Sequence, residues 1–108
     1  MVAAALDEVG AMIGLATAGA TRDEHALTGW ELYSINVVFE QQGSGLADDL
    51  IRVTVGDRDT TVWVLSDNAR AQSFYIRQGF RIEGATMVDE VTGACEMRMV
   101  RRPAQAER

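Results

Sequence analysis

The sequence predicts a single α+β domain in which helices flank a mixed, mostly antiparallel sheet. β-branched and aromatic residues gather in short runs separated by turn residues, as in a chain of strands. Two helical patterns interrupt these runs, and the first joins two strands by a crossover that should be parallel. The 108 residues suit one domain, 1–108, and contain neither a repeat nor a linker.

Composition narrows the possible functions. The chain is 47% hydrophobic and 24% charged, which is typical of globular proteins, and its net charge is −6. This charge argues against nucleic acid or a membrane surface as a partner and is compatible with a cationic substrate such as an amine. The single cysteine, Cys95, predicts a reducing, cytoplasmic location. No segment resembles a signal peptide or a membrane span, and we predict no metal site.

Three strands are expected in the first part of the chain, over residues 2–6, 11–20 and 30–38. Period-2 alternation in the third strand predicts two faces. One would carry Glu31, Tyr33, Ile35 and Val37, and the other Leu32, Ser34, Asn36 and Val38. His25, the only histidine, lies in the polar connection before this strand, where we expect it to be solvated.

A glycine turn then leads into a helix predicted over residues 44–55, with an apolar stripe of Leu46, Leu50, Ile51 and Val53. A strand followed by glycines and a helix N-terminus is typical of phosphate-binding sites. The turn is not a Walker A loop, because the chain has no lysine. It also lacks the third glycine of the Rossmann fingerprint. With these two loop types excluded, the turn is interpreted as a pyrophosphate-binding loop of another kind.

The second half of the chain should begin with a central buried strand over residues 61–65. Asn68 should cap a helix over residues 69–78, with Ala71, Phe74 and Tyr75 on its inner face. Residues 80–87 and 94–100 should form an antiparallel hairpin in which Cys95 is a small buried side chain. Residues 101–108 should be a frayed polar tail.

Two blocks of this sequence resemble the GNAT N-acetyltransferase superfamily. Residues 42–47, Gln-Gly-Ser-Gly-Leu-Ala, are similar to the family's Arg/Gln-x-x-Gly-x-Gly/Ala pyrophosphate loop. Residues 68–80 look like its Asn-x-x-Ala-x-x-x-Tyr-x-x-x-Gly-Phe helix. The two blocks together, each after a strand, carry the resemblance, which extends over residues 9–100. It implies a GNAT-like fold that lacks the usual first strand and two helices.

The resemblance also implies a co-substrate and its binding residues. Acetyl-CoA would lie where the strand before the glycine turn and the next strand splay apart. Val37 and Val38 would offer backbone groups to pantetheine, and Asn68 would face the sulfur end. The pyrophosphate would bind the backbone N–H groups of Gln42, Gly43, Ser44, Gly45, Leu46 and Ala47.

By the same resemblance, the reaction is direct attack of an amine on the thioester, with Tyr75 as the general acid. Glu31 matches a glutamate that acts as the base in some members. It would need a water relay, since four to six residues of strand place it roughly 13–20 Å from the acetyl group. The acceptor would be a small amine, an amino acid or a protein N-terminus. The alternative is a non-catalytic acyl-CoA-binding or protein-interaction module.

The chain departs from the family pattern at three places. Without the usual front elements, apolar surface would be uncovered, so we expect a homodimer or another partner to cover it. Gln42 stands where arginine is common, and two acids, Asp48 and Asp49, follow in the first helical turn. An arginine could offset these losses at the nucleotide end of CoA, and the candidates are Arg52, Arg70 and Arg77.

Overall fold

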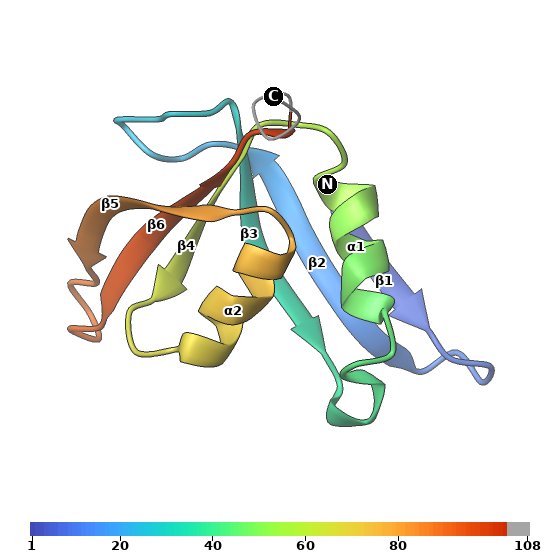
Figure 1. Ribbon diagram of the computed structural model, residues 1–108. Helices are drawn as coiled ribbons and strands as arrows, with labels where there is room; N and C mark the ends of the chain where they lie inside the picture. The colour runs from blue at the N-terminus through green and yellow to red at the C-terminus, as the bar shows by residue number, and fades with distance from the viewer. Residues whose placement is uncertain (104–108) are drawn as a thin grey trace.

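A six-stranded sheet forms the centre of the computed structural model, which describes residues 1–103 (Figure 1). The strand order across it is β1-β2-β3-β4-β6-β5, and every neighbouring pair is antiparallel except β3 and β4. The mixed, mostly antiparallel sheet is therefore confirmed. The strand bounds are β1 Val2–Leu6, β2 Met12–Ala20, β3 Trp30–Val37, β4 Thr60–Leu65, β5 Arg81–Val88 and β6 Cys95–Arg101.

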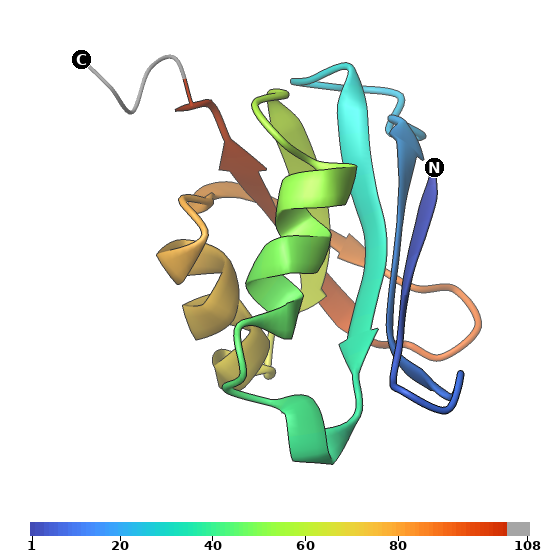
Figure 2. The same ribbon diagram turned by 90° about the vertical axis from the view of Figure 1, so that its right-hand side faces the viewer.

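Both α-helices lie on the same face of this sheet (Figures 1 and 2). Helix α1, Leu46–Thr54, packs over β1, β2 and β3, and helix α2, Ala69–Arg77, follows β4. A short 3-10 turn, Phe39–Gln41, joins β3 to the glycine turn. Arg101 closes β6 instead of opening a tail, and residues 104–108 of the predicted tail lie outside the described part.

The buried stripe of α1 differs from the predicted one. Leu50, Ile51 and Thr54 are its buried residues, whereas Val53 is 55% exposed. At 100° per residue, Val53 lies about 200° around the helix from Ile51, so both cannot face the sheet. The alcohol of Thr54 is tolerated there because it donates to the Leu50 carbonyl at 2.7 Å.

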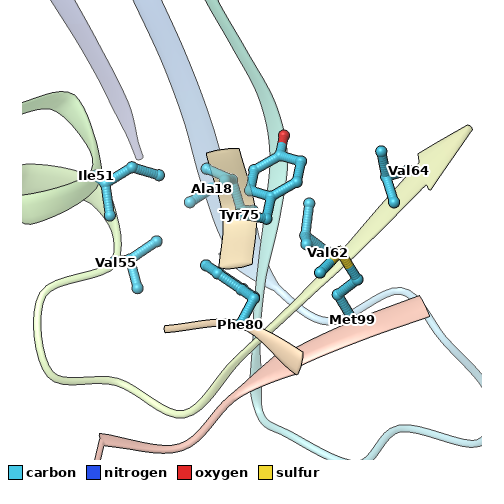
Figure 3. Packing of buried hydrophobic residues seen from close by; sticks show 9 residues of the cluster. Ala18, Ile51, Val55, Val62, Val64, Tyr75, Phe80 and Met99 are labelled. Carbon is cyan, nitrogen blue, oxygen red and sulfur yellow. The ribbon is translucent and has the colours of Figure 1, made fainter. Parts of the chain in front are cut away.

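The core lies between the helices and the sheet (Figure 3). Ile51 and Val55 enter it from the α1 side, and Phe80 packs edge-to-face on Tyr75 at 5.6 Å between ring centroids. As predicted, Ala71 and Phe74 pack against the same cluster. The strands supply the rest of the cluster: Ala18, Leu32, Val62, Val64 and Met99.

The opposite face of the sheet carries a group of ion pairs centred on Arg98. Because Met97 and Met99 turn toward the helices, Arg98 between them projects from the other face. Its guanidinium bonds Asp23 at 2.5 Å and Glu83 at 2.7 Å, and lies 5.6 Å from the Trp63 ring centre. The segment between β2 and β3, which holds Asp23, is thereby fixed over this face.

A β-bulge at Tyr33 sets the shape of β3. Thr17 pairs with Ser34 and Ala18 pairs with Leu32, which leaves Tyr33 without a partner on β2. The predicted alternation is wrong for this reason, because Leu32 and Ile35 both contact the core under the helices. Beyond the bulge β3 also leaves β4, since their parallel pairing ends at Leu32 and Val62.

Cys95 lies at the surface of the sheet. Cys95 is exposed, contrary to the prediction, because it is the first residue of β6, directly after the turn that connects β5 and β6. Its sulfur lies 3.4 Å from the Ser66 hydroxyl. In residues 1–103 no helix is long and apolar enough to cross a membrane.

Candidate active site

A cleft of about 470 Å³ opens where β3 and β4 separate. One wall is the end of β3 with Ile35, Asn36 and Val37, followed by the glycine turn and the start of α1. The other wall is α2, from its cap Asn68 to Arg77. The bulge at Tyr33 and the end of β3–β4 pairing therefore create the space between the two helices.

The glycine turn presents unpaired backbone donors to this cleft. Gly43 and Gly45 have φ values of 83° and 91°, a conformation that favours glycine, and a Cβ on either would point into open space. Within residues 1–103, the N–H groups of Gly43, Gly45 and Ala47 have no protein acceptor. Unpaired N–H groups at a helix N-terminus are an arrangement that favours anions in general.

The other N–H groups predicted for the cradle are bonded within the protein. Those of Gln42 and Ser44 donate to the carbonyls of Phe39 and Gln41, and that of Leu46 donates to the Ser44 hydroxyl. These bonds hold the turn in shape. Along residues 42–47, bonded and unbonded N–H groups therefore alternate from one residue to the next.

Helix α2 brings Tyr75 to the opposite wall. Its ring packs between Phe74 and Phe80, and its hydroxyl lies at the end of the ring away from Phe80 (Figure 3). No hydrogen-bond partner for this hydroxyl occurs in residues 1–103, and burial of the ring raises the pKa of Tyr75 above its ordinary value. Tyr75 is thus a protonated donor without a protein acceptor. The helix that carries it begins at Asn68, whose side chain accepts from the Ala71 N–H at 3.0 Å, as predicted for a cap.

Charges of both signs line the cleft. Arg70 donates to the side chain of Gln42, and Gln78 donates to Asp48, so both walls are joined by side chains. Arg77 also lines the space. Of the three arginines considered from sequence, Arg52 is not among the lining residues and instead pairs with Asp49 at 2.9 Å.

Most of the residues predicted for the site meet in this one cleft: Val37, Gln42, Gly43, Gly45, Ala47, Asn68 and Tyr75. Four do not line it, namely Val38, Ser44, Leu46 and the proposed base Glu31. The N–H of Val38 donates to the Ile13 carbonyl at 3.0 Å. Four apolar or polar residues that were not predicted for the site also line the cleft: Ile35, Asn36, Ala71 and Phe74.

Glu31 lies elsewhere, in a second cavity of about 580 Å³ on the sheet face opposite the helices. Glu31 is 3% exposed. Its carboxylate accepts two hydrogen bonds from Arg22, one from the backbone N–H and one from the guanidinium. Glu31 and Tyr75 therefore do not share a cavity. His25 lines the same second cavity, between Glu24 and the ion pairs of Arg98.

Several solved structures share the fold of this chain. The model matches an acetyltransferase assigned to the GNAT family from Desulfovibrio desulfuricans, with a TM-score of 0.74 and 24% identity over 94% of this chain and 68% of that one. It matches Naa20 of Chaetomium thermophilum, solved with a bisubstrate analogue, at a TM-score of 0.73 and 17% identity over 96% and 68%. It also matches a chain of the NatC complex bound to Gag peptide and CoA, at 0.74 and 14% over 94% and 70%.

The chain therefore has the GNAT fold, as its two sequence blocks predicted. It spans about two thirds of the length of the structures that it matches, 68%, 64% and 64% in three of them. No family model matches the sequence, and no curated protein matches it. At these identities, the similarity establishes the fold and leaves activity to be argued from the cleft.

Proposed function

We propose that this chain binds acetyl-CoA in the cleft between α1 and α2 and transfers the acetyl group to an amine by direct attack. One observation supports this most: the strand split, three unpaired N–H groups and the Tyr75 hydroxyl all border one cleft. Two of the structures with this fold were solved with CoA or a bisubstrate analogue, which supports the same ligand class here.

The residues of the cleft fit the parts of this ligand. The N–H groups of Gly43, Gly45 and Ala47 would hold the pyrophosphate, and Arg70 and Arg77 on the facing helix would supply the positive charge that Gln42 lacks. Beyond Leu32, β3 pairs with β2 as far as Val37 but no longer with β4, so its edge toward β4 would offer backbone groups to the pantetheine arm. When bound, acetyl-CoA supplies an activated acetyl thioester.

Tyr75 would act as the general acid that gives a proton to the leaving thiolate. Its raised pKa keeps the hydroxyl protonated at neutral pH, and its ring is fixed by edge-to-face contacts at 5.4 and 5.6 Å. The base role of Glu31 stays a prediction. Because Arg22 already bonds both of its oxygens, Glu31 would need a water molecule to reach the amine.

Calorimetric titration of acetyl-CoA tests the binding step. In Gly45→Glu a carboxylate would enter the anion site, so we expect binding to be lost. Gly10→Glu is the matched control, since Gly10 has a similar φ of 87° with equal free space in the turn between β1 and β2, outside the cleft. Equal affinity of the two variants would contradict the proposed cradle.

Release of CoA with a panel of amines tests the chemical step. Tyr75→Phe should lower kcat by about 10²-fold or more while acetyl-CoA still binds, because the general acid is lost and the ring remains. If the protein binds acetyl-CoA, releases no CoA with any amine, and Tyr75→Phe changes nothing, the chain is instead an acyl-CoA-binding module.

A further inference from the structure

The second cavity lies beside the first along β3 but on the other face of the sheet. Leu32 and Val62 contact the core under the helices, so Glu31 and Trp63, which adjoin them in sequence, project from the opposite face. The second cavity includes Tyr33, and the first begins two residues later at Ile35. Both cavities therefore border the place where β3 leaves β4.

The walls of the second cavity carry an excess of negative charge. Four carboxylates line it against one arginine, Arg22. Two of the four are neutralised, because Glu31 pairs with Arg22 and Asp23 pairs with Arg98. The other two, Glu24 and Glu96, form no salt bridge with any residue in the range 1–103.

These two carboxylates decide which ligand the cavity can hold. The aromatic rings are less available, since the Arg22 guanidinium lies 4.1 Å from the Tyr33 ring centre and Arg98 lies 5.6 Å from that of Trp63. Recognition of a cation would therefore depend on Glu24 and Glu96 rather than on an aromatic cage. An anionic or zwitterionic ligand would place its carboxylate beside these two charges, which is unfavourable.

We propose that the second cavity binds the acceptor, and that this acceptor is a small diamine or an amine carrying a second positive charge. The proposal rests on the proposed acetyl transfer. One nitrogen, in its neutral form, would reach the split between β3 and β4 and attack the thioester carbon. The C–N bond forms as the C–S bond breaks, the amine loses one proton, and the thiolate takes one. The second nitrogen stays protonated and is held by Glu24 and Glu96.

The first test is a calorimetric titration of 1,4-diaminobutane into the full chain at low salt, without acetyl-CoA. Glu96→Gln should raise Kd about tenfold or more, because a charge-assisted bond is lost. Glu90→Gln, an exposed position in the turn between β5 and β6, is the matched control and should leave Kd unchanged. Glu24→Gln, on an exposed part of the β2–β3 segment, gives a second variant with no packing to disturb.

The second test is kinetic. The ratio of kcat/KM for 1,4-diaminobutane to that for butylamine should be well above one in the wild type and fall about tenfold in Glu96→Gln. A ratio near one, or one that Glu96→Gln does not alter, would overturn the proposal while leaving acetyl transfer intact. Diamine binding that Glu96→Gln weakens in a protein that does not bind acetyl-CoA would overturn the acceptor role and the proposed function together.

Discussion

The two faces of the sheet are stabilised by different physics although the same strands form them. On the helix side, β4 and β6 place Val62 and Met99 in an apolar core with almost no exposed surface. On the other side, the same strands place Trp63 and Arg98 in a group of ion pairs with Asp23 and Glu83. The first face depends on buried apolar area and the second on charge, so they should respond differently to mutation and to pH.

The largest effect is expected on the apolar face. Phe80 is 1% exposed and contacts the Tyr75 ring, so Phe80→Ala should lower the free energy of unfolding by about 3–5 kcal/mol, measured by urea denaturation. Phe39→Ala is the control at an 80% exposed position and should change it by less than about 0.5 kcal/mol. Similar losses in the two variants would show that the core is not where the structure places it.

The charged face should give the next largest effect. Arg98→Met should lower the free energy of unfolding by about 1–3 kcal/mol, because the carboxylates of Asp23 and Glu83, with side chains 14% and 30% exposed, lose their charged partner. Asp23→Asn added to this variant should restore part of the loss. The control is Arg52→Met, whose exposed pair with Asp49 should contribute less than about 0.5 kcal/mol. A neutral Arg98→Met would mean that the β2–β3 segment is held by other contacts.

Acid should weaken the charged face selectively. The backbone N–H of His25 and the Arg98 guanidinium lower the pKa of Asp23, and hydrogen bonding from Arg98 lowers that of Glu83. Because both pKa values are lower in the folded state, this stabilisation is complete above the unfolded values of about 4 and is lost as the pH falls through the folded ones. Urea midpoints measured from pH 6 to pH 2 should therefore fall more steeply for the wild type than for Arg98→Met. Parallel curves would contradict the coupling.

The smallest effect is expected at Cys95. Cys95→Ser should change the free energy of unfolding by less than about 0.5 kcal/mol, since the side chain is exposed at the start of β6. The thiol of the native protein should react with a disulfide reagent at the rate of a free cysteine. Slow labelling of the folded chain, followed by fast labelling in urea, would show that the thiol is buried after all.

Local signals predicted most of the fold. Turn residues and β-branched runs marked the strands, and Gly56, with a φ of 57°, ends α1 as its place in the sequence indicated. The glycine turn and the cap at Asn68 could also be predicted from the sequence, because each depends only on neighbouring residues. Short-range patterns were therefore sufficient for the helices, the strands and the glycine turn.

Features that depend on distant residues were not predicted. Asp23 and Arg98 are separated by 75 positions, and nothing near either one indicates the other. The bulge at Tyr33 depends on how β3 pairs with β2, so alternation within β3 alone assigned Ile35 to the wrong face. Val53 shows the same limit in a helix, since apolar character by itself did not identify which side of α1 meets the sheet.

The bulge makes the strand wall of the cleft depend on the number of residues in β3. β3 contains one residue more than its partner strand can pair, and this extra residue turns Ile35 and Val37 toward the helices. If Tyr33 stayed in β3 and paired in regular alternation, Ile35 and Val37 would face away from the helices, and Asn36 would lie under α1 in place of apolar side chains. Deleting Tyr33 would instead remove the bulge and keep Ile35 and Val37 on the helix side, because Leu32 and Ile35 would then be two positions apart. The same amino acids, paired without the bulge, would thus lose the strand wall of the cleft.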